Sequence, residues 1–177
     1  MGNNETAVFG GGCFWCTEAI FKQVRGVISV MPGYAGGWKA APTYHEVCNG
    51  DTGHAEVIRV EYDPQVITYG DLLEVFWLAH DPTTLNRQGN DIGEQYRSII
   101  LFTDELQKTQ AELSLKAVNQ SGQFSQPVTT LIQPLETFYP AEEYHQDYFN
   151  RNPHQPYCYA VISPKLKHFL EIYTREK

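Results

Sequence analysis

Two cysteines, Cys13 and Cys16, follow a run of three glycines and flank a Phe-Trp pair in the stretch VFGGGCFWCTEAIF. This spacing suits three kinds of chemistry: half of a metal site, a redox-active dithiol, or one reactive thiol with a neighbour. Two familiar thiol sites do not fit. A phosphatase-type loop needs an arginine where this chain has Ala19, and a thioredoxin-like motif has its Trp before the first cysteine, whereas Trp15 lies between the two.

Cys13 lies at the point where a strand pattern changes to a helix pattern. Residues 6–9 are β-prone, the glycines at 10–12 break that pattern, and helical spacing runs from Cys13 to about Val24. The start of a helix directs unpaired N–H groups and the positive end of its dipole at such a sulfur, and both favour the thiolate. We therefore expect Cys13 to be nucleophilic near neutral pH, although a small buried thiol would fit the same position.

The aromatic pair lies off the helix face that the two cysteines share. Cys13, Cys16 and Ile20 fall on one face of the expected helix, while Phe14 and Trp15 point elsewhere. These two rings either pack beneath a loop or line a pocket beside the thiol, and their positions in the sequence leave both interpretations open.

A carboxylate heads the apolar face of a later strand. Alternation along EVIRVEY places Glu56 on the same side as Ile58, Val60 and Tyr62. Burial raises the pKa of a carboxyl group, so Glu56 would hold a proton near neutral pH and act as a general acid. The alternative is a residue at the strand end that turns out to solvent.

Two tyrosines lie in or beside the long loops 33–53 and 80–96. Loops of this length in a compact domain are usually functional, and a phenol can donate to an oxygen that gains charge during a reaction. Tyr44 and Tyr96 are therefore candidates for such donors. The chain has 11 tyrosines, however, and most tyrosines are packing residues with one end in water.

The remaining pattern alternates strands with helices, which predicts an α+β fold: a two-layer α/β sandwich with a mixed sheet and long functional loops. Thr68 is a candidate helix cap. We expect strands at 53–64, 97–103, 128–132 and 157–162, and helices at 68–81, 104–119, 141–149 and 165–174.

Length and charge restrict the classes of function. The 177 residues fit one catalytic domain, 1–177. The net charge of −8 and the lack of any Lys/Arg cluster argue against a nucleic-acid partner. No window has the apolar length of a membrane span or a signal peptide, so we expect a cytoplasmic monomer with no membrane partner.

Several motifs, in this order, closely resemble the A-type peptide methionine sulfoxide reductases over residues 8–168: GGGCFW, GYAGG, PTYHEVCNGDTGHAE, YDP, DIGEQYRS, YHQDYF and NPHQPYC. The combination of GCFW, GYAGG and TGHAE is far more specific than a bare C-x-x-C. The resemblance implies a two-layer α/β sandwich with a ferredoxin-like core. It also implies an oxidoreductase that needs no metal or other cofactor.

The same resemblance implies catalytic roles for the residues discussed above. Cys13 matches the nucleophile, which attacks the sulfoxide sulfur, releases methionine and becomes a sulfenic acid. Glu56 matches the acid that protonates the sulfoxide oxygen. Tyr44 and Tyr96 match the phenols that hydrogen-bond this oxygen.

Substrate and partners follow from the resemblance in the same way. Phe14 and Trp15 match the apolar pocket for the methyl group of the sulfoxide, and Asp91 matches a residue associated with the backbone amide of the substrate. The family acts on the S epimer of methionine sulfoxide, free or in proteins, and so repairs oxidised proteins. Thioredoxin usually returns it to the thiol state.

The resolving thiol is left open, because many members have glycine in place of Cys16 and carry recycling cysteines on a later tail. Cys16 is the first candidate, since it shares a helix face with Cys13; a disulfide between them requires Cys13 at the very N-terminus of the helix. Cys158 is second, although it falls in an expected strand. Cys48 is expected to be a small buried side chain, and an external thiol is the remaining alternative.

The cysteine pattern allows two other interpretations. A structural zinc site would use Cys13, Cys16, Cys48 and His54, but the last two have poor ligand spacing. A general thiol-disulfide oxidoreductase would use the first two thiols, but it needs no buried acid such as Glu56.

Two histidines, His80 and His145, are expected to be surface or packing residues rather than bases or ligands.

Overall fold

A six-stranded mixed sheet forms the centre of the computed structural model, which describes residues 3–175; the ends of the predicted 1–177 domain lie outside these residues. The strand order is β7-β6-β1-β3-β2-β8, and all neighbours pair antiparallel except the parallel β6 and β7. The strands are β1 (Glu5–Gly10), β2 (Val27–Ala35), β3 (Ala55–Tyr62), β6 (Ile99–Phe102), β7 (Leu131–Pro134) and β8 (Tyr139–Pro140). The expected α+β class is confirmed.

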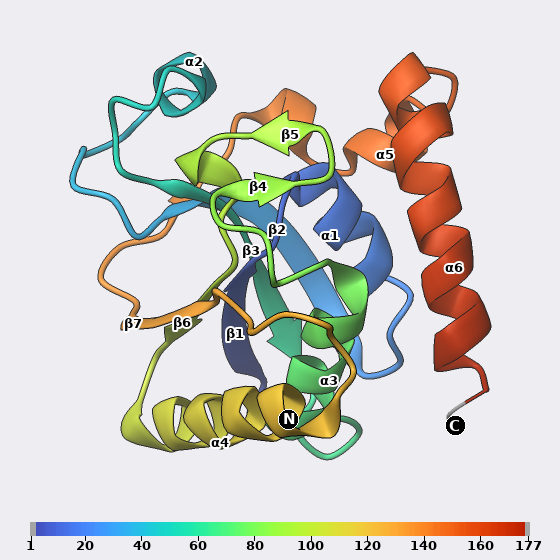
Figure 1. Ribbon diagram of the computed structural model, residues 1–177. Helices are drawn as coiled ribbons and strands as arrows, with labels where there is room; N and C mark the ends of the chain where they lie inside the picture. The colour runs from blue at the N-terminus through green and yellow to red at the C-terminus, as the bar shows by residue number, and fades with distance from the viewer. Residues whose placement is uncertain (1–2, 176–177) are drawn as a thin grey trace.

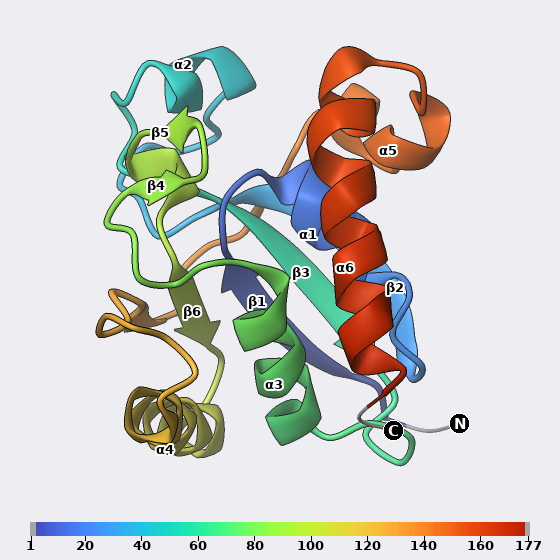
Figure 2. The ribbon, with the colours of Figure 1, turned by 45° about the vertical axis from the view of Figure 1, so that its right-hand side comes forward.

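Helices surround this sheet, and several short elements gather at one end of it (Figure 1). Helices α1, α3 and α6 pack against one another, and α4 packs on α3, β6 and β7. Helix α2, α5 and the β4-β5 hairpin lie at the end of the sheet where α1 begins, as Figure 2 shows from a second side. The bounds are α1 (Phe14–Phe21), α2 (Tyr44–Cys48), α3 (Tyr69–Ala79), β4 (Arg87–Gln88), β5 (Asp91–Ile92), α4 (Glu105–Ser121), α5 (Tyr148–Arg151) and α6 (Ser163–Tyr173).

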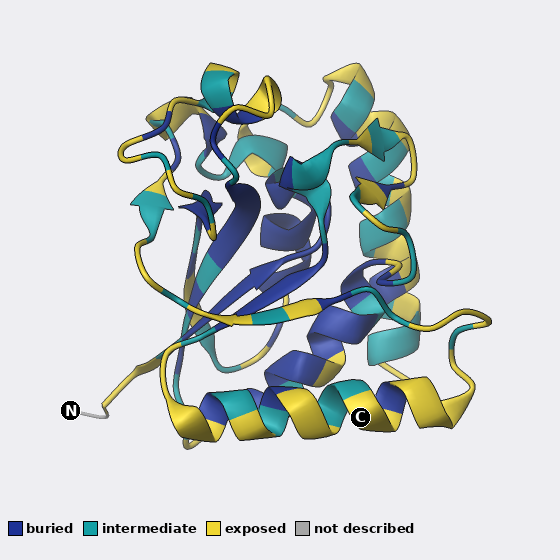
Figure 3. Cartoon of the chain, turned by 60° about the vertical axis from the view of Figure 1, so that its left-hand side comes forward, coloured by how far each residue is buried: buried dark blue, intermediate teal, exposed yellow. Residues whose placement is uncertain are grey.

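Alternation along the central strands divides the apolar residues between two cores. From β3, Ile58 and Val60 enter the large core on the helical side, whereas Val57 joins a smaller core on the other side with Val8 and Ile99. Figure 3 shows the central strands buried along most of their length and α4 exposed along its outer side. Both faces of the sheet are therefore covered, which fixes its register.

Local signals explain the helix starts. The hydroxyl of Thr68 accepts the N–H of Asp71, whose carboxylate accepts the N–H of Thr68, so a capping box begins α3 as the sequence predicts. A second capping box at Thr43 begins α2 within the loop 33–53. The expected loop 80–96 likewise contains the β4-β5 hairpin and a 3₁₀ turn at Glu94–Tyr96.

The strand expected at 157–162 is wrong. Cys158–Ile162 forms a π-helical turn that continues directly into α6. Aromatic and β-branched residues favour a strand here, but the burial follows a helical period: Cys158 and Ile162 are buried, while Tyr159 is 76% exposed. The short helix expected at 141–149 forms in two pieces, a 3₁₀ turn at Glu143–His145 and α5.

Within residues 3–175, no helix has both the length and the apolar character required to cross a membrane.

Candidate active site

A tight turn after β1 places Cys13 at the end of the sheet where α2, α5 and the β4-β5 hairpin lie (Figures 1 and 2). Gly12 has φ +85°, and a Cβ at this position would lie 2.6 Å from Cγ of Gln88, so both the conformation and the space require glycine. The N–H of Gly12 donates to the carbonyl of Tyr96 at 3.2 Å. This bond ties the turn to the loop that carries one of the candidate phenols.

Cys13 is the N-cap residue of α1. Its backbone is extended, with φ −62° and ψ 128°, and its carbonyl accepts the N–H of Cys16 at 3.1 Å. The side chain is 7% exposed. Burial raises the pKa of the Cys13 thiol, helped by its hydrogen bond to Cys16 and by the nearby carboxyl of Glu56. The expectation of a resting thiolate is therefore wrong, because burial outweighs the helix terminus.

Cys16 lies beside Cys13 in an apolar cluster that also contains Cys158. The hydrogen bond from the Cys13 thiol is the largest cause that lowers the pKa of Cys16, and the positive charge of Lys165 acts in the same direction. All four cysteines of the chain are free thiols. Cys13 and Cys16 thus form a hydrogen-bonded pair whose ionisations depend on each other.

Glu56 enters the site from β3 as the alternation predicts. It is 1% exposed, and its Oε2 accepts the N–H of Phe14 at 3.0 Å. Burial raises its pKa to about 8, although the bond from Phe14 acts in the opposite direction. At neutral pH the carboxyl group therefore holds a proton beside Cys13.

Two phenols face this carboxyl group from separate segments. Tyr44 is the first residue of α2, and Tyr96 ends the 3₁₀ turn. Burial raises the pKa of both phenols, and the charge of Glu56 is the second cause in each case. Both tyrosines therefore stay protonated near Glu56, and the phenol of Tyr44 hydrogen-bonds Cys48 in this structure.

Aromatic rings surround the start of α1. The ring of Phe14 packs within 5.1 to 6.5 Å, between centroids, of the rings of Trp15, Tyr34, Tyr44 and His145. The indole of Trp15 stacks on Tyr148 at 3.8 Å, nearly parallel, and donates its N–H to Nδ1 of His145 at 3.0 Å. A buried thiol, a protonated carboxyl group, two phenols and an apolar wall therefore meet at one place.

A family described as "Peptide methionine sulfoxide reductase" matches residues 5–177. The chain belongs to the peptide methionine sulfoxide reductase family. It is 54% identical over 171 residues to the "Peptide methionine sulfoxide reductase MsrA" of Nautilia profundicola, covering 97% of each chain. The chain is therefore an oxidoreductase that reduces methionine sulfoxide.

Solved structures agree with this membership. The reduced form of Mxr1 from Saccharomyces cerevisiae superposes with a TM-score of 0.82 at 34% identity, covering 88% of this chain and 89% of the yeast chain. Mxr1 in complex with Trx2 superposes with a TM-score of 0.56 at 23% identity, covering 82% and 84%.

The fold brings all the residues predicted for the site to this end of the sheet, and Cys48 lies there too, hydrogen-bonded to Tyr44. Asp91, on β5, is half-buried, and its Oδ2 accepts the hydroxyl of Tyr157 at 2.7 Å. Cys158 is buried beside Cys16, from the helix that replaces the expected strand. Cys48 was expected to be buried, and this is wrong: it is exposed at the end of α2.

Glu142, Tyr148 and Tyr157 also belong to the site but were not singled out from the sequence. Glu142 accepts the hydroxyl of Tyr34 at 3.0 Å and the N–H of Tyr44 at 3.1 Å, so it holds α2 against β2. His145 was expected to be a surface or packing residue, and it is buried among the aromatic rings. Tyr148 and Tyr157 lie in the motifs YHQDYF and NPHQPYC. These motifs were part of the family resemblance and could have identified both tyrosines as site residues.

His54 explains why the zinc interpretation does not fit the structure. Its Nδ1 accepts the N–H of Gly37 at 3.0 Å, and its Nε2 lies 2.7 Å from the carbonyl of Lys39. Both ring nitrogens are thus used to hold a loop. Among residues 3–175, no three Cys, His, Asp or Glu side chains gather in a way that could hold a metal ion.

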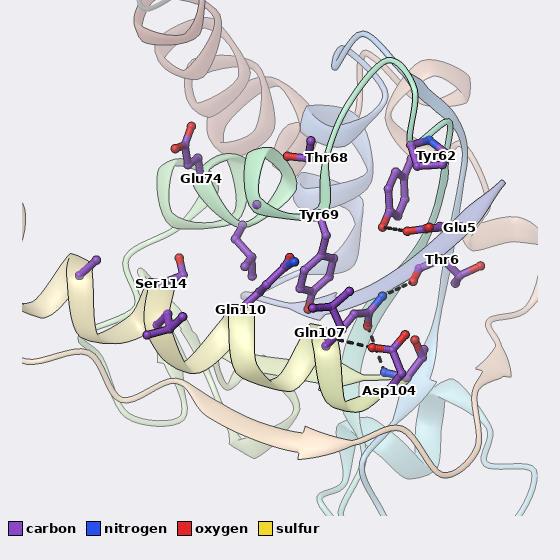
Figure 4. A pocket seen from close by; sticks show the side chains of 17 residues that line it. Glu5, Thr6, Tyr62, Thr68, Tyr69, Glu74, Asp104, Gln107, Gln110 and Ser114 are labelled. Atoms are coloured by element: carbon purple, nitrogen blue, oxygen red, sulfur yellow. Dashed lines mark hydrogen bonds between the residues drawn. The ribbon is translucent and has the colours of Figure 1, made fainter. Parts of the chain in front are cut away.

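An open cavity of about 920 Å³ lies between α3 and α4, away from this chemistry (Figure 4). Two of its polar groups pair with neighbours in the lining: Tyr62 donates to Glu5 at 2.7 Å, and the amide of Gln107 donates to the carbonyl of Thr6 at 2.8 Å. None of the residues predicted for the active site lines it.

Proposed function

We propose that this reductase acts on the S epimer of methionine sulfoxide, free or in proteins, and so repairs oxidised proteins. The observation that carries the proposal is the position of Glu56: its carboxyl group is buried, protonated near neutral pH, and fixed by the Phe14 N–H beside the thiol of Cys13. A thiol that only exchanges disulfides needs no such acid.

In the first step, Glu56 gives its proton to the sulfoxide oxygen while the sulfur of Cys13 attacks the sulfoxide sulfur. Protonation of the oxygen makes the sulfoxide sulfur more positive. This charge favours the thiolate form of Cys13 at the moment of attack and so offsets the raised pKa of the Cys13 thiol. The proton lost from Cys13 restores the carboxyl group. Methionine leaves, and Cys13 keeps the oxygen as a sulfenic acid.

The two phenols stabilise the oxygen as its charge changes. Tyr44 and Tyr96 come from separate loops and both face Glu56. Their raised pKa values keep them neutral donors, so they add hydrogen bonds without competing with Glu56 as acids.

The rest of the substrate lies against the aromatic wall. Phe14 and Trp15 take the methyl group, and the stacking of Trp15 on Tyr148 fixes the orientation of the indole. Asp91 accepts the backbone amide of the substrate through Oδ1, since Oδ2 accepts the hydroxyl of Tyr157.

Cys16 resolves the sulfenic acid by forming a disulfide with Cys13, and thioredoxin then reduces this disulfide. Two observations support Cys16 over Cys158. Cys13 is the N-cap of α1, which is the position from which a C-x-x-C pair can close, and the Cys13 and Cys16 thiols are already hydrogen-bonded to each other. The yeast relative Mxr1 in complex with Trx2 supports thioredoxin as the reductant.

The architecture follows the same resemblance. The order β6-β1-β3-β2, with α1 and α3 as the crossovers, supports a ferredoxin-like core within a two-layer sandwich. We infer one catalytic domain that works as a monomer.

A single turnover tests the function. Fully reduced protein is mixed with excess methionine S-sulfoxide and no added thiol, methionine is counted per chain, and the cysteines are mapped by peptide mass. We expect about one methionine per chain and a disulfide between Cys13 and Cys16.

Two results would change this proposal. A sulfenic acid that persists on Cys13 would mean that an external thiol completes the cycle, and a disulfide between Cys13 and Cys158 would identify Cys158 as the resolving thiol. No methionine from folded, reduced protein, or equal turnover of the R epimer, would refute the proposed function.

A further inference from the structure

The hydroxyl of Tyr157 lies between a thiol and a carboxylate. It donates to Oδ2 of Asp91 at 2.7 Å and lies 3.8 Å from Sγ of Cys16. A phenol has one proton to donate and two lone pairs to accept with. While that proton points at Asp91, the protonated thiol of Cys16 is placed to donate in the second contact; once Cys16 is ionised, the phenol donates to it and lowers its pKa. Cys16, Tyr157 and Asp91 thus form a directed chain of hydrogen bonds.

The three residues come from three elements, so the fold builds this chain of hydrogen bonds. Cys16 is on the first turn of α1, Asp91 is on β5, and Tyr157 directly precedes the π-helical turn. The ring of Tyr157 is held edge-on against Trp15, at 5.8 Å and 75°.

The thiol of Cys16 needs an exit for its proton. Cys16 is 2% exposed, so bulk water does not reach it readily, whereas Asp91 is half-buried at the edge of the site. The titratable and charged groups that act on Cys16 are Cys13 on its own helix, Tyr157 and Cys158 before α6, Lys165 on α6, Asp91 on β5 and Glu56 on β3. Of these, only Tyr157 connects the thiol to a carboxylate through hydrogen bonds.

We propose that Tyr157 is a proton relay, which passes the proton of Cys16 to Asp91 when Cys16 attacks the sulfenic acid on Cys13. This inference rests on the proposed function, and it assigns Tyr157 to the second half of the cycle.

The step balances without any further reactant. The bond between the two sulfurs forms as the bond between the Cys13 sulfur and its oxygen breaks, so Cys16 is oxidised and Cys13 is reduced to the disulfide level. The proton of Cys16 moves to the oxygen of Tyr157, whose own proton moves to Asp91. The departing hydroxide takes the proton of Glu56 and leaves as water. Asp91 then gives its proton to the solvent at the edge of the site, and Glu56 regains one when the site next opens to exchange substrate, so water is the only net product besides the disulfide.

The phenol keeps a proton throughout this step. Burial raises the pKa of Tyr157, and the charges of Cys13 and Cys16 act in the same direction, so it does not ionise by itself. It accepts one proton as it gives up the other, which is the behaviour required of a relay rather than a base.

The substitution Tyr157→Phe removes the relay and keeps the ring against Trp15. Reduced protein is mixed rapidly with methionine S-sulfoxide without a reductant and then quenched with acid at set times. Released methionine reports the first step, and the fraction of Cys13 that still reacts with dimedone reports the remaining sulfenic acid. The matched control is Tyr159→Phe, because Tyr159 is two residues away and 76% exposed.

We expect Y157F to release about one methionine per chain and to lose its sulfenic acid roughly tenfold or more slowly than the wild type or Y159F. The pH at which disulfide formation reaches half its maximal rate should also move upward, since the thiol must then lose its proton directly to solvent. A second variant, Asp91→Asn, keeps an oxygen for the phenol but takes up no proton, and it should slow the same step at saturating substrate.

The outcomes separate this inference from the proposed function. Wild-type disulfide formation by folded Y157F at every pH would overturn the relay, as would a disulfide from Cys13 to Cys158 in the wild type. If Y157F does not fold, the test rests on D91N. An unchanged rate of disulfide formation in D91N overturns the relay, and a slowed rate supports it. Failure of the wild type to release methionine would instead refute the proposed function.

Discussion

The substitution Glu56→Gln keeps the size of the side chain and an oxygen to accept the Phe14 N–H, but it removes the group that can ionise. In the wild type, burial raises the pKa of Glu56 from 4.5 to about 8. The unfolded chain therefore ionises first as the pH rises. Between these two values unfolding releases a proton, so the wild type loses stability with increasing pH.

The raised pKa of Glu56 sets the expected size of this loss. Each pH unit between 4.5 and about 8 removes about 1.4 kcal/mol of unfolding free energy, which amounts to about 5 kcal/mol in all. Below pH 4.5 both states are protonated and nothing is lost. E56Q has no such dependence. Its stability relative to the wild type should therefore increase by about 5 kcal/mol across this range and then level off, whatever constant cost the buried amide adds.

Urea unfolding at a series of pH values from about 4 to 9 measures this difference. The matched control is Glu61→Gln on the same strand, where hydrogen bonds from Asn4 and Ser29 lower the pKa of the carboxyl group. E61Q should gain no stability over the wild type in this range.

Methionine release provides the second measurement on the same variant. In the wild type its rate should fall above pH 8, as Glu56 loses its proton. E56Q should be about 10²-fold to 10⁴-fold slower below pH 8, and the difference should narrow above it. A difference in stability between E56Q and the wild type that stays constant with pH would show that Glu56 ionises as an ordinary surface glutamate does, and it would refute its role as the acid.

Three further outcomes are expected. Tyr44→Phe and Tyr96→Phe should each slow methionine release about tenfold to a hundredfold without changing its pH profile, because both phenols are already protonated; a shifted profile in stopped assays would contradict this. Trp15→Phe removes the bond to His145, and it should raise the KM for methionine S-sulfoxide about tenfold in steady-state assays with dithiothreitol, with kcat affected less. Cys48→Ser should leave methionine release unchanged, whereas intact-mass analysis of the wild type should find Cys48 alkylated before the buried thiols; early labelling of Cys13 would count against its burial.

Signals carried by short stretches of sequence predicted the structure well. The alternation of EVIRVEY identified the buried side of β3 and with it Glu56, because a strand between two covered faces allows only one register. Thr68 identified the start of α3, because a capping box is complete within four residues. The glycines before Cys13 identified the turn into α1 for the same reason.

Features that depend on distant neighbours were not predictable in this way. The stretch at 157–162 has the composition of a strand, and only packing of Cys158 and Ile162 against α1 makes it helical. The pKa of Cys13 also depends on how deeply the folded chain buries it, and that is not visible in a helix start alone. The carboxylate of Glu142 contacts α2 and β2 across about a hundred residues of chain, far beyond any local pattern.

The burial of Cys13 has a consequence for the oxidised proteins that the reductase can repair. With 7% of the residue exposed and aromatic rings around it, the sulfoxide must project fully from its own backbone before it meets the sulfur. A methionine sulfoxide packed inside a folded client protein is reached only after that client opens locally. Repair therefore follows the client's own fluctuations: damage at surfaces and in unfolded segments is removed first, and damage in a rigid core persists until that core loosens.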